Sequence, residues 1–131
     1  MRHGWQLLNL YNMKTATNVK TIDAAGRTLG RVATEVATSL LGKNRVQFER
    51  NVYSGVPVKV INASKLRITE KKLEEIFHTR YSGIPGGLRV IHGTETRDKE
   101  GLKELIRLAT YKMLPGNKLR RTMMKNLKIE N

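Results

Sequence analysis

Apolar positions in the first third of the chain follow a helical repeat. From residue 28 to residue 41 they recur at steps of three and one and form one continuous face, which consists of Leu29, Val32, Ala33, Val36, Ala37, Leu40 and Leu41. Thr28 precedes this run as a suitable N-cap, and Gly42 follows it where a left-handed residue commonly ends a helix. The pattern predicts a helix over residues 28–41 with its apolar face in the core.

Short β-type runs stand on both sides of this helix. Residues 19–23 (VKTID) precede it, residues 56–62 (VPVKVIN) follow it, and residues 65–69 (KLRIT) alternate again. The order strand, helix, strand predicts a parallel crossover. Thr69 is placed to cap a helical turn, and residues 76–81 (IFHTRY) are interpreted as a further strand that leads into the loop SGIPGG.

Two more helical patterns occupy the carboxyl-terminal third. In residues 99–112 the apolar set is Leu102, Leu105, Ile106 and Ala109, and Pro115 ends the pattern. In the last segment, which Asn117 is placed to cap, Leu119, Met123 and Leu127 lie four apart. The pattern predicts a basic helical segment at this end.

The length of the chain indicates one domain, expected over residues 13–131. Residues 1–12 are too short and too polar for a secretory signal, and Met13 is an alternative start. We therefore expect residues 1–12 to be a leader outside the fold.

The charge of the chain indicates a polyanionic partner. Twenty-five Lys and Arg stand against 11 Asp and Glu, which gives a formal charge of +14 and a pI near 10.5. Nucleic acid is the first candidate. A membrane is the weaker one, because the cations are spread along the chain and no apolar run approaches the roughly 18–20 residues of a spanning helix. The chain has no cysteine, which excludes disulfides and thiolate metal sites.

Catalytic motifs find little support. Gly26 and Gly30 lack the spacing of a dinucleotide loop, and the pair Gly42–Lys43 lacks the upstream glycine and the following Ser or Thr of a P-loop. The histidines, which are His3, His78 and His92, have no metal-ligand spacing. We expect no enzymatic activity, no cofactor and no metal.

The start of the first helix carries Arg27 and Arg31, two charges of the same sign as the helix dipole at that end. A cation at this end of a helix lowers the stability of the helix by about 0.3–1 kcal/mol. A phosphate would remove the conflict, because backbone N–H groups, dipole and guanidinium groups would all point at one anion. The alternative interpretation is two solvated arginines. A small enzyme or switch that binds a nucleotide phosphate here is the second functional hypothesis.

Four segments in order carry a resemblance to a known family. They are IDAAGRTLGRVATEVATSLLGK, VINASKLRIT, RYSGIPGGL and MLPGNKL, and the match as a whole extends over about residues 22–129. The chain resembles universal large-subunit ribosomal protein number thirteen in its bacterial form. It departs from the family pattern at Val19, where tryptophan is usual, at the sequence SGVP in place of a Gly-Asp loop, and at Lys112 and Arg120, where glycine is common.

The resemblance implies an α/β fold: a three-layer α/β/α domain around a small, mainly parallel four-stranded sheet, with the basic helical segment at its carboxyl end. It implies a structural component of the large ribosomal subunit that binds large-subunit rRNA and helps early assembly. The implied partners are that rRNA and neighbouring ribosomal proteins, with no membrane, and the chain is expected to be a monomer within the ribosome. The implied location is the cytoplasm, with an organellar ribosome as the alternative.

Candidate RNA-binding residues combine cations with small loop residues, because folded RNA is bound through phosphates, 2′-hydroxyls and shape. Pro85 limits the flexibility of the SGIPGG loop, and its glycines allow close backbone approach. In the basic helical segment at the carboxyl end, which we call the tail, like charges four residues apart repel one another in water. The candidates are Arg27, Arg31, Lys43, Arg45, Arg80, Ser82, Gly86, Gly87, Arg89, Lys118, Arg120, Arg121, Lys125 and Lys128.

Overall fold

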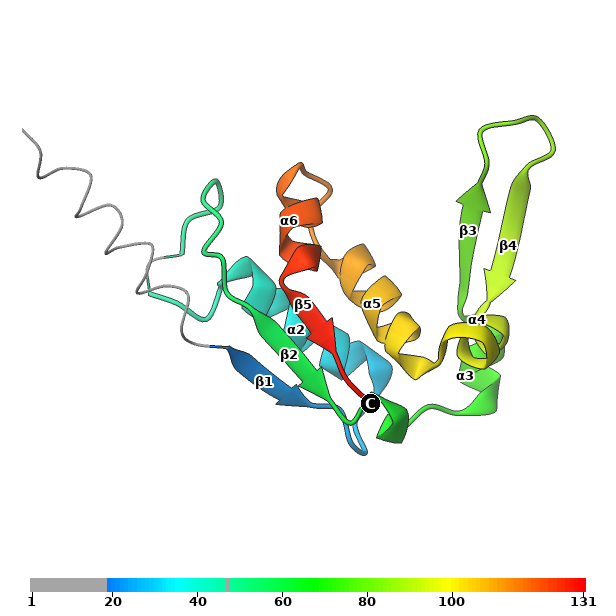
Figure 1. Cartoon of the computed structure of the whole chain (residues 1–131), viewed down its shortest axis with the longest axis horizontal. Coiled ribbons are helices and arrows are strands. Elements are labelled where there is room, and N and C mark those ends of the chain that lie inside the picture. Colours follow the sequence, from blue (N-terminus) through cyan, green and yellow to red (C-terminus); the bar gives the residue numbers. More distant parts are fainter. Residues whose placement is uncertain (1–18, 47) are drawn as a thin grey trace, which may run out of the picture.

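A three-stranded parallel sheet organises the main body of the protein (Figure 1). The structure, a computed structural model, describes residues 19–46 and 48–131, so the expected leader and Met13 lie outside the described part. The strands β1 (Lys20–Asp23), β2 (Val58–Ile61) and β5 (Leu127–Ile129) lie in the order β1-β2-β5. All pairings in this sheet are parallel. The expected α/β class with a mainly parallel sheet is confirmed.

Helix α2 (Leu29–Leu41) connects β1 to β2, as the apolar repeat predicts. Thr28 has the extended backbone of an N-cap, but its side chain makes no capping hydrogen bond. Gly42 ends the helix in a left-handed conformation with φ +77°, and the N–H of Lys43 donates to the carbonyl of Thr38 at 3.1 Å. The predicted bounds of this helix are confirmed at both ends.

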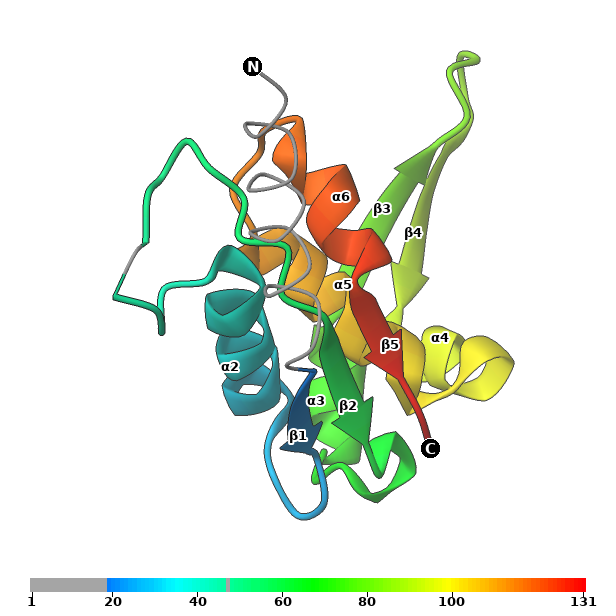
Figure 2. The same ribbon diagram turned by 60° about the vertical axis from the view of Figure 1, so that its left-hand side comes forward.

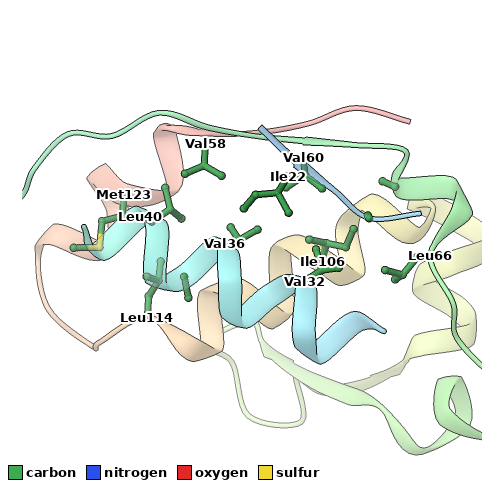
Figure 3. Close-up of a cluster of buried hydrophobic side chains, with 13 residues drawn as sticks. Ile22, Val32, Val36, Leu40, Val58, Val60, Leu66, Ile106, Leu114 and Met123 are labelled. Carbon is green, nitrogen blue, oxygen red and sulfur yellow. The ribbon is translucent and has the colours of Figure 1, made fainter. Parts of the chain in front are cut away.

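The core lies between α2 and one face of the sheet. Val32, Val36 and Leu40 are fully buried on α2. Figure 3 shows them beneath the strands, together with side chains from later in the chain. The labelled partners are Ile22, Val58 and Val60 from the sheet, Leu66, Ile106, Leu114 and Met123. Burial of these side chains fixes the register of the strands, because a slip by one residue would expose them.

The opposite face of the sheet is mainly polar in the described structure, although half-buried Ile61 also lies on it. Thr21 and Lys128 are exposed there, and Lys59 pairs with Glu130 at 2.8 Å between Nζ and Oε1. The described helices that pack on the sheet lie on its other face (Figures 2 and 3). A second helical layer, which a three-layer domain requires, is therefore not confirmed.

The expected four-stranded sheet is not confirmed either. Residues 65–69, which alternate in the sequence, contribute a single parallel bridge between Thr28 and Arg67. The 3-10 turn η1 (Ala63–Lys65) precedes this run and ends at its first residue. The bridge places Arg67 beside the start of α2, where its N–H donates to the carbonyl of Arg27 at 2.9 Å.

An antiparallel hairpin, separate from the sheet, follows helix α3 (Glu70–Glu75). Thr69 caps α3 as predicted, because its side chain accepts a hydrogen bond from the N–H of Lys72 at 3.4 Å. Strand β3 (Phe77–Tyr81), which the sequence predicts, pairs with β4 (Leu88–His92), and the SGIPGG loop connects them. We call residues 77–92 the arm; it projects away from the body (Figures 1 and 2).

The predicted helix over residues 99–112 is correct only from residue 102. Helix α4 (Gly93–Glu100), which has no apolar stripe to reveal it, ends at Gly101, where φ is +83°. Helix α5 (Leu102–Met113) then begins and packs along α2.

The tail differs from the prediction in its last residues. Helix α6 (Leu119–Lys125) is present and Asn117 caps it, since its Oδ1 accepts hydrogen bonds from the N–H groups of Leu119 and Arg120. Leu127, predicted on the same helix, instead begins strand β5. The open edge of β2 supplies backbone partners there: Val58 donates to the carbonyl of Asn126 at 2.9 Å. Leu127 therefore lies in the sheet, because its segment pairs with β2, although its spacing suits a helix. Its side chain still packs against the core.

Candidate RNA interface

Arg27 has an intramolecular partner that the sequence pattern did not indicate. Its Nη2 lies 2.6 Å from Oε2 of Glu35, which is two turns into α2, and both side chains remain more than a third exposed. Lys20 approaches the same carboxylate at 4.0 Å. The expectation that Arg27 requires an external anion is therefore wrong in part, because Glu35 supplies a carboxylate from within the chain.

Arg31 keeps the unfavourable position that the sequence predicts. It is exposed in the first turn of α2, which contains no acidic residue, and it forms no ion pair with any described residue. Arg67, which was not a candidate, comes close to this helix start through the bridge to Thr28. No local signal indicates Arg67, since only the fold joins residues so far apart in sequence. The helix start therefore presents Arg31 and Arg67 to an anion in solution.

The turn between β1 and α2 is organised by Asp23. Its Oδ1 accepts hydrogen bonds from the N–H of Ala25 and from Nδ2 of Asn62, each at 3.0 Å. The backbone bond from Ala25 first, and then the bond from Asn62, lower the pKa of this exposed carboxyl below its usual value of 3.8. This carboxylate therefore holds the Gly26 turn, and with it the position of Arg27.

The arm has two chemically different faces. Directly paired residues share a face of an antiparallel ladder. Arg80 pairs with Arg89 and both are exposed, so the arginines occupy one face. Tyr81 pairs with Leu88 on the other face, where Phe77 and Val90 also lie, and all four of these side chains are more than half exposed. The two arginines were expected only as charges that flank the loop, and the apolar face was not expected, although strict alternation of residues carries that signal.

The glycines of the SGIPGG loop are explained by the loop itself. Gly86 has φ +80°, a conformation that other residues rarely adopt. A Cβ on Gly87 would collide with the Ser82 hydroxyl and would lie 2.9 Å from the carbonyl oxygen of Ile84. Valine at these two positions would therefore disturb the turn as well as any contact with RNA. Contact of Ser82, Gly86 and Gly87 with RNA stays a prediction.

The basic residues of the tail fall into two groups. Arg120 is half-buried and engaged: its Nε donates to the carbonyl of Pro115 at 2.9 Å, and its guanidinium lies 4.6 Å from the ring centre of Tyr111. Arg121 and Lys125 on α6 and Lys118 just before it are exposed and form no ion pair with any described residue. Arg120 therefore has a structural role, whereas the other three cations are available for a ligand.

The remaining candidates lie apart from these groups. Lys43 is exposed and Arg45 half-buried in the segment that follows the Gly42 helix end, and Lys128 is exposed on the polar face of β5. The arm loop and the start of α6 point toward the same end of the molecule in both views, whereas the start of α2 lies toward the opposite end (Figures 1 and 2). The arm and α6 therefore point in the same direction from separate parts of the molecule, and the helix start that carries Arg27 and Arg31 lies elsewhere.

Charge is segregated along the chain. Acidic residues are concentrated between residues 70 and 104, and none occurs in residues 77–92 or 105–129. Several of them pair with cations of the same region, Glu104 with nearby Arg107 and Glu70 with Arg97, which is distant in sequence. Among the candidate cations, Arg27 alone forms an ion pair with a described residue. The arm and the tail therefore carry positive charge that nothing in the described chain neutralises.

No group of three or more His, Asp or Glu side chains in the described part of the chain is placed to hold a metal ion. No helix in residues 19–46 or 48–131 is long and apolar enough to cross a membrane.

Comparisons with known proteins agree with the resemblance in the sequence. The family model described as Ribosomal protein L13 matches residues 17–129. The chain is 46% identical over 108 residues to large ribosomal subunit protein uL13 of Thermus thermophilus, covering 82% of this chain and 76% of that protein. The proteins of the same name from Clostridioides difficile and Aliivibrio fischeri are 43% and 41% identical over 108 residues, each covering 82% of this chain and 75% of the relative. This is a family of ribosomal proteins and not of enzymes, and the chain belongs to it.

Proposed function

We propose that this chain is a structural component of the large ribosomal subunit that binds large-subunit rRNA and helps its early assembly. The observation that carries the proposal is the set of exposed cations on the arm and on α6 that have no counter-charge within the described chain. A formal charge of +14 destabilises a compact chain through self-repulsion, which a surrounding polyanion relieves. We therefore expect the folded chain to be less stable when it is free than when it is bound to RNA.

The geometry suits recognition of shape and phosphate. The cationic groups lie on separate elements, so they fit several backbone strands of a folded RNA and not one short motif. The arm places its arginines at a distance from the body, where they can reach between RNA helices. Reading of the base sequence is not required for such binding.

The relatives support this proposal by name, since each is a protein of the large ribosomal subunit. We infer that the chain functions as a monomer within the cytoplasmic ribosome, beside other large-subunit proteins. The alternative is an enzyme that binds a nucleotide at the start of α2, and the comparisons do not support it. It is also weakened by the Glu35 carboxylate, which already engages Arg27.

Sucrose-gradient sedimentation tests the proposal. The source cell expresses the chain with an epitope tag, and large subunits are separated at low magnesium from small subunits and free protein. The chain is expected in the large-subunit fraction and in early large-subunit precursors. A chain confined to the top of the gradient, together with saturable binding of ATP or GTP to the free protein, would support the enzyme instead.

A further inference from the structure

A groove of about 1140 Å³ opens between the start of α2, residues 67–69, α3, the base of the arm and α5. Its walls are mainly aliphatic and come from segments distant in sequence. The apolar residues that line it are Leu29, Ile68, Ile76, Phe77, Leu105, Leu108, Ala109 and Met113. No described segment fills this groove.

The charges around the groove are predominantly positive. Arg31, Arg67, Lys72 and Lys112 line it, against the single carboxylate of Glu75. Glu75 is already paired with Lys72, at 3.3 Å between Oε2 and Nζ. Lys112 donates from Nζ to the carbonyl of Phe77 at 3.2 Å, which neutralises no charge. The rim thus presents uncompensated positive charge around an apolar floor.

The apolar surface continues beyond the groove. Phe77 lines the groove and is 55% exposed, and it shares the apolar face of the arm with Tyr81 and Leu88. Met113 on the facing helix is 43% exposed. A contiguous apolar surface of this kind, rimmed by polar groups, marks an interaction site in soluble proteins.

We propose that the groove receives an acidic amphipathic helix of a neighbouring large-subunit protein. Its apolar stripe lies on the aliphatic floor, and its carboxylates face Arg31, Arg67 and Lys112. Helix-in-groove binding commonly uses apolar anchors of this type, and the charge of the rim selects an acidic partner. This inference rests on the proposed function, because the partner is a component of the same subunit.

RNA is the competing occupant, and the floor disfavours it. Phosphates would satisfy the rim, but bases bind protein surfaces chiefly by stacking on planar side chains. Only Phe77 and His78 offer rings, both at the arm end, whereas the rest of the floor is aliphatic. A nucleotide chain would leave most of this apolar surface in contact with water.

Site-specific photo-crosslinking within assembled subunits tests the proposal. Benzoylphenylalanine replaces Met113 in the groove or, as a matched control, Lys103, which is exposed on the same helix and does not line the groove. Large subunits that contain each variant are purified, irradiated and digested with ribonuclease or protease. Sedimentation with the subunit reports on the proposed function, and the identity of the crosslinked product reports on the groove.

The expected product from position 113 is a ribonuclease-resistant crosslink to one large-subunit protein, absent from position 103. Mass spectrometry is expected to place it in a helical segment with an apolar stripe and flanking Asp or Glu. Four outcomes overturn the inference: a crosslink to rRNA, a crosslink to a basic or wholly polar segment, equal crosslinking from both positions, or none. In each case the proposed function stands as long as the variants sediment with the subunit.

A binding measurement then tests the charge of the rim. The peptide identified by the crosslink is synthesised and titrated against the purified chain and its variants. Lys112→Glu should weaken binding by about two- to fivefold, the effect of an exposed ion pair, whereas Lys103→Glu leaves it unchanged. Equal affinities for both variants would contradict recognition by the rim.

Discussion

Arg80 and Arg89 lie directly opposite one another across the β3–β4 ladder. Like charges in this position destabilise a hairpin, and residues 77–92 contain no carboxylate that could separate them. A two-stranded hairpin is also only marginally stable in water by itself. We therefore propose that the arm is more stable in the bound state, in which an anion lies against the arginine face.

Reversing one of these charges should affect folding and binding in opposite directions. Arg89→Glu converts a repulsive cross-strand pair into an attractive one, which is worth about 0.2–1 kcal/mol. We expect slower hydrogen exchange of the arm amides in the free protein and weaker binding to large-subunit rRNA. Lys103→Glu makes the same change of charge outside the candidate interface and should alter both much less. Faster exchange in Arg89→Glu would contradict the cross-strand repulsion.

The two arginines near the start of α2 should behave differently from one another. Arg27→Gln removes the ion pair with Glu35 and should destabilise the free protein by up to about 1 kcal/mol. Arg31→Gln removes a cation from the positive end of the helix and should stabilise it by about 0.3–1 kcal/mol. Urea unfolding measures both. Equal effects of the two substitutions on the free energy of unfolding would show that the ion pair with Glu35 does not make Arg27 differ from Arg31.

The tail allows a matched comparison on one helix. Arg121→Glu with Lys125→Glu alters exposed side chains, so we expect a change in stability within about 0.5 kcal/mol and clearly weaker rRNA binding. Arg120→Ala removes the bond to Pro115 and the contact with Tyr111 and should cost about 1 kcal/mol of stability. Thermal unfolding and RNA binding of both variants check this. A double variant that unfolds would show that these exposed cations are structural.

Much of the body of the fold was predictable because local signals and tertiary packing agree there. The apolar stripe of α2 and its end at Gly42 are local features, and the core uses them as they stand. Leu127 shows the limit of this approach. Its spacing from Met123 suits a helix, but the edge of β2 offers hydrogen-bond partners that no local pattern reveals.

The candidate site was predictable in its charges but not in its pairings. An excess of cations is visible in the composition, whereas the contact between Arg27 and Glu35 depends on how the chain enters α2. The positions of Arg67 and Lys112 around one groove depend on segments that are distant in sequence and meet only in the fold. Alternation in the arm carried a usable signal for the apolar face, because pairing in a hairpin follows from its loop.

The turn before α2 should make a pH-dependent contribution to stability. The folded pKa of Asp23 is lowered, so its contribution is present above the ordinary aspartate pKa of 3.8 and is lost as the pH falls below that value. The wild type should be more stable than Asp23→Ala at neutral pH, and the difference should shrink in acid. Urea unfolding of both proteins from pH 7 downward measures it. The control is Glu74→Ala, which removes an exposed carboxylate on α3. A difference in stability between the wild type and Asp23→Ala that grows in acid would contradict a lowered pKa of Asp23 in the folded state.

The salt dependence of rRNA binding by the free protein tests the central claim most directly. If the exposed cations of the arm and α6, together with Lys118, Lys43 and Lys128, neutralise about six to ten phosphates, affinity should fall by about 10³- to 10⁵-fold between about 50 and 200 mM salt. Filter binding or fluorescence anisotropy with a large-subunit rRNA fragment that contains the binding site measures this slope. The Arg121→Glu, Lys125→Glu variant should show a shallower slope than the wild type. An affinity that stays constant over this range would contradict the account that unpaired positive charge binds this chain to RNA.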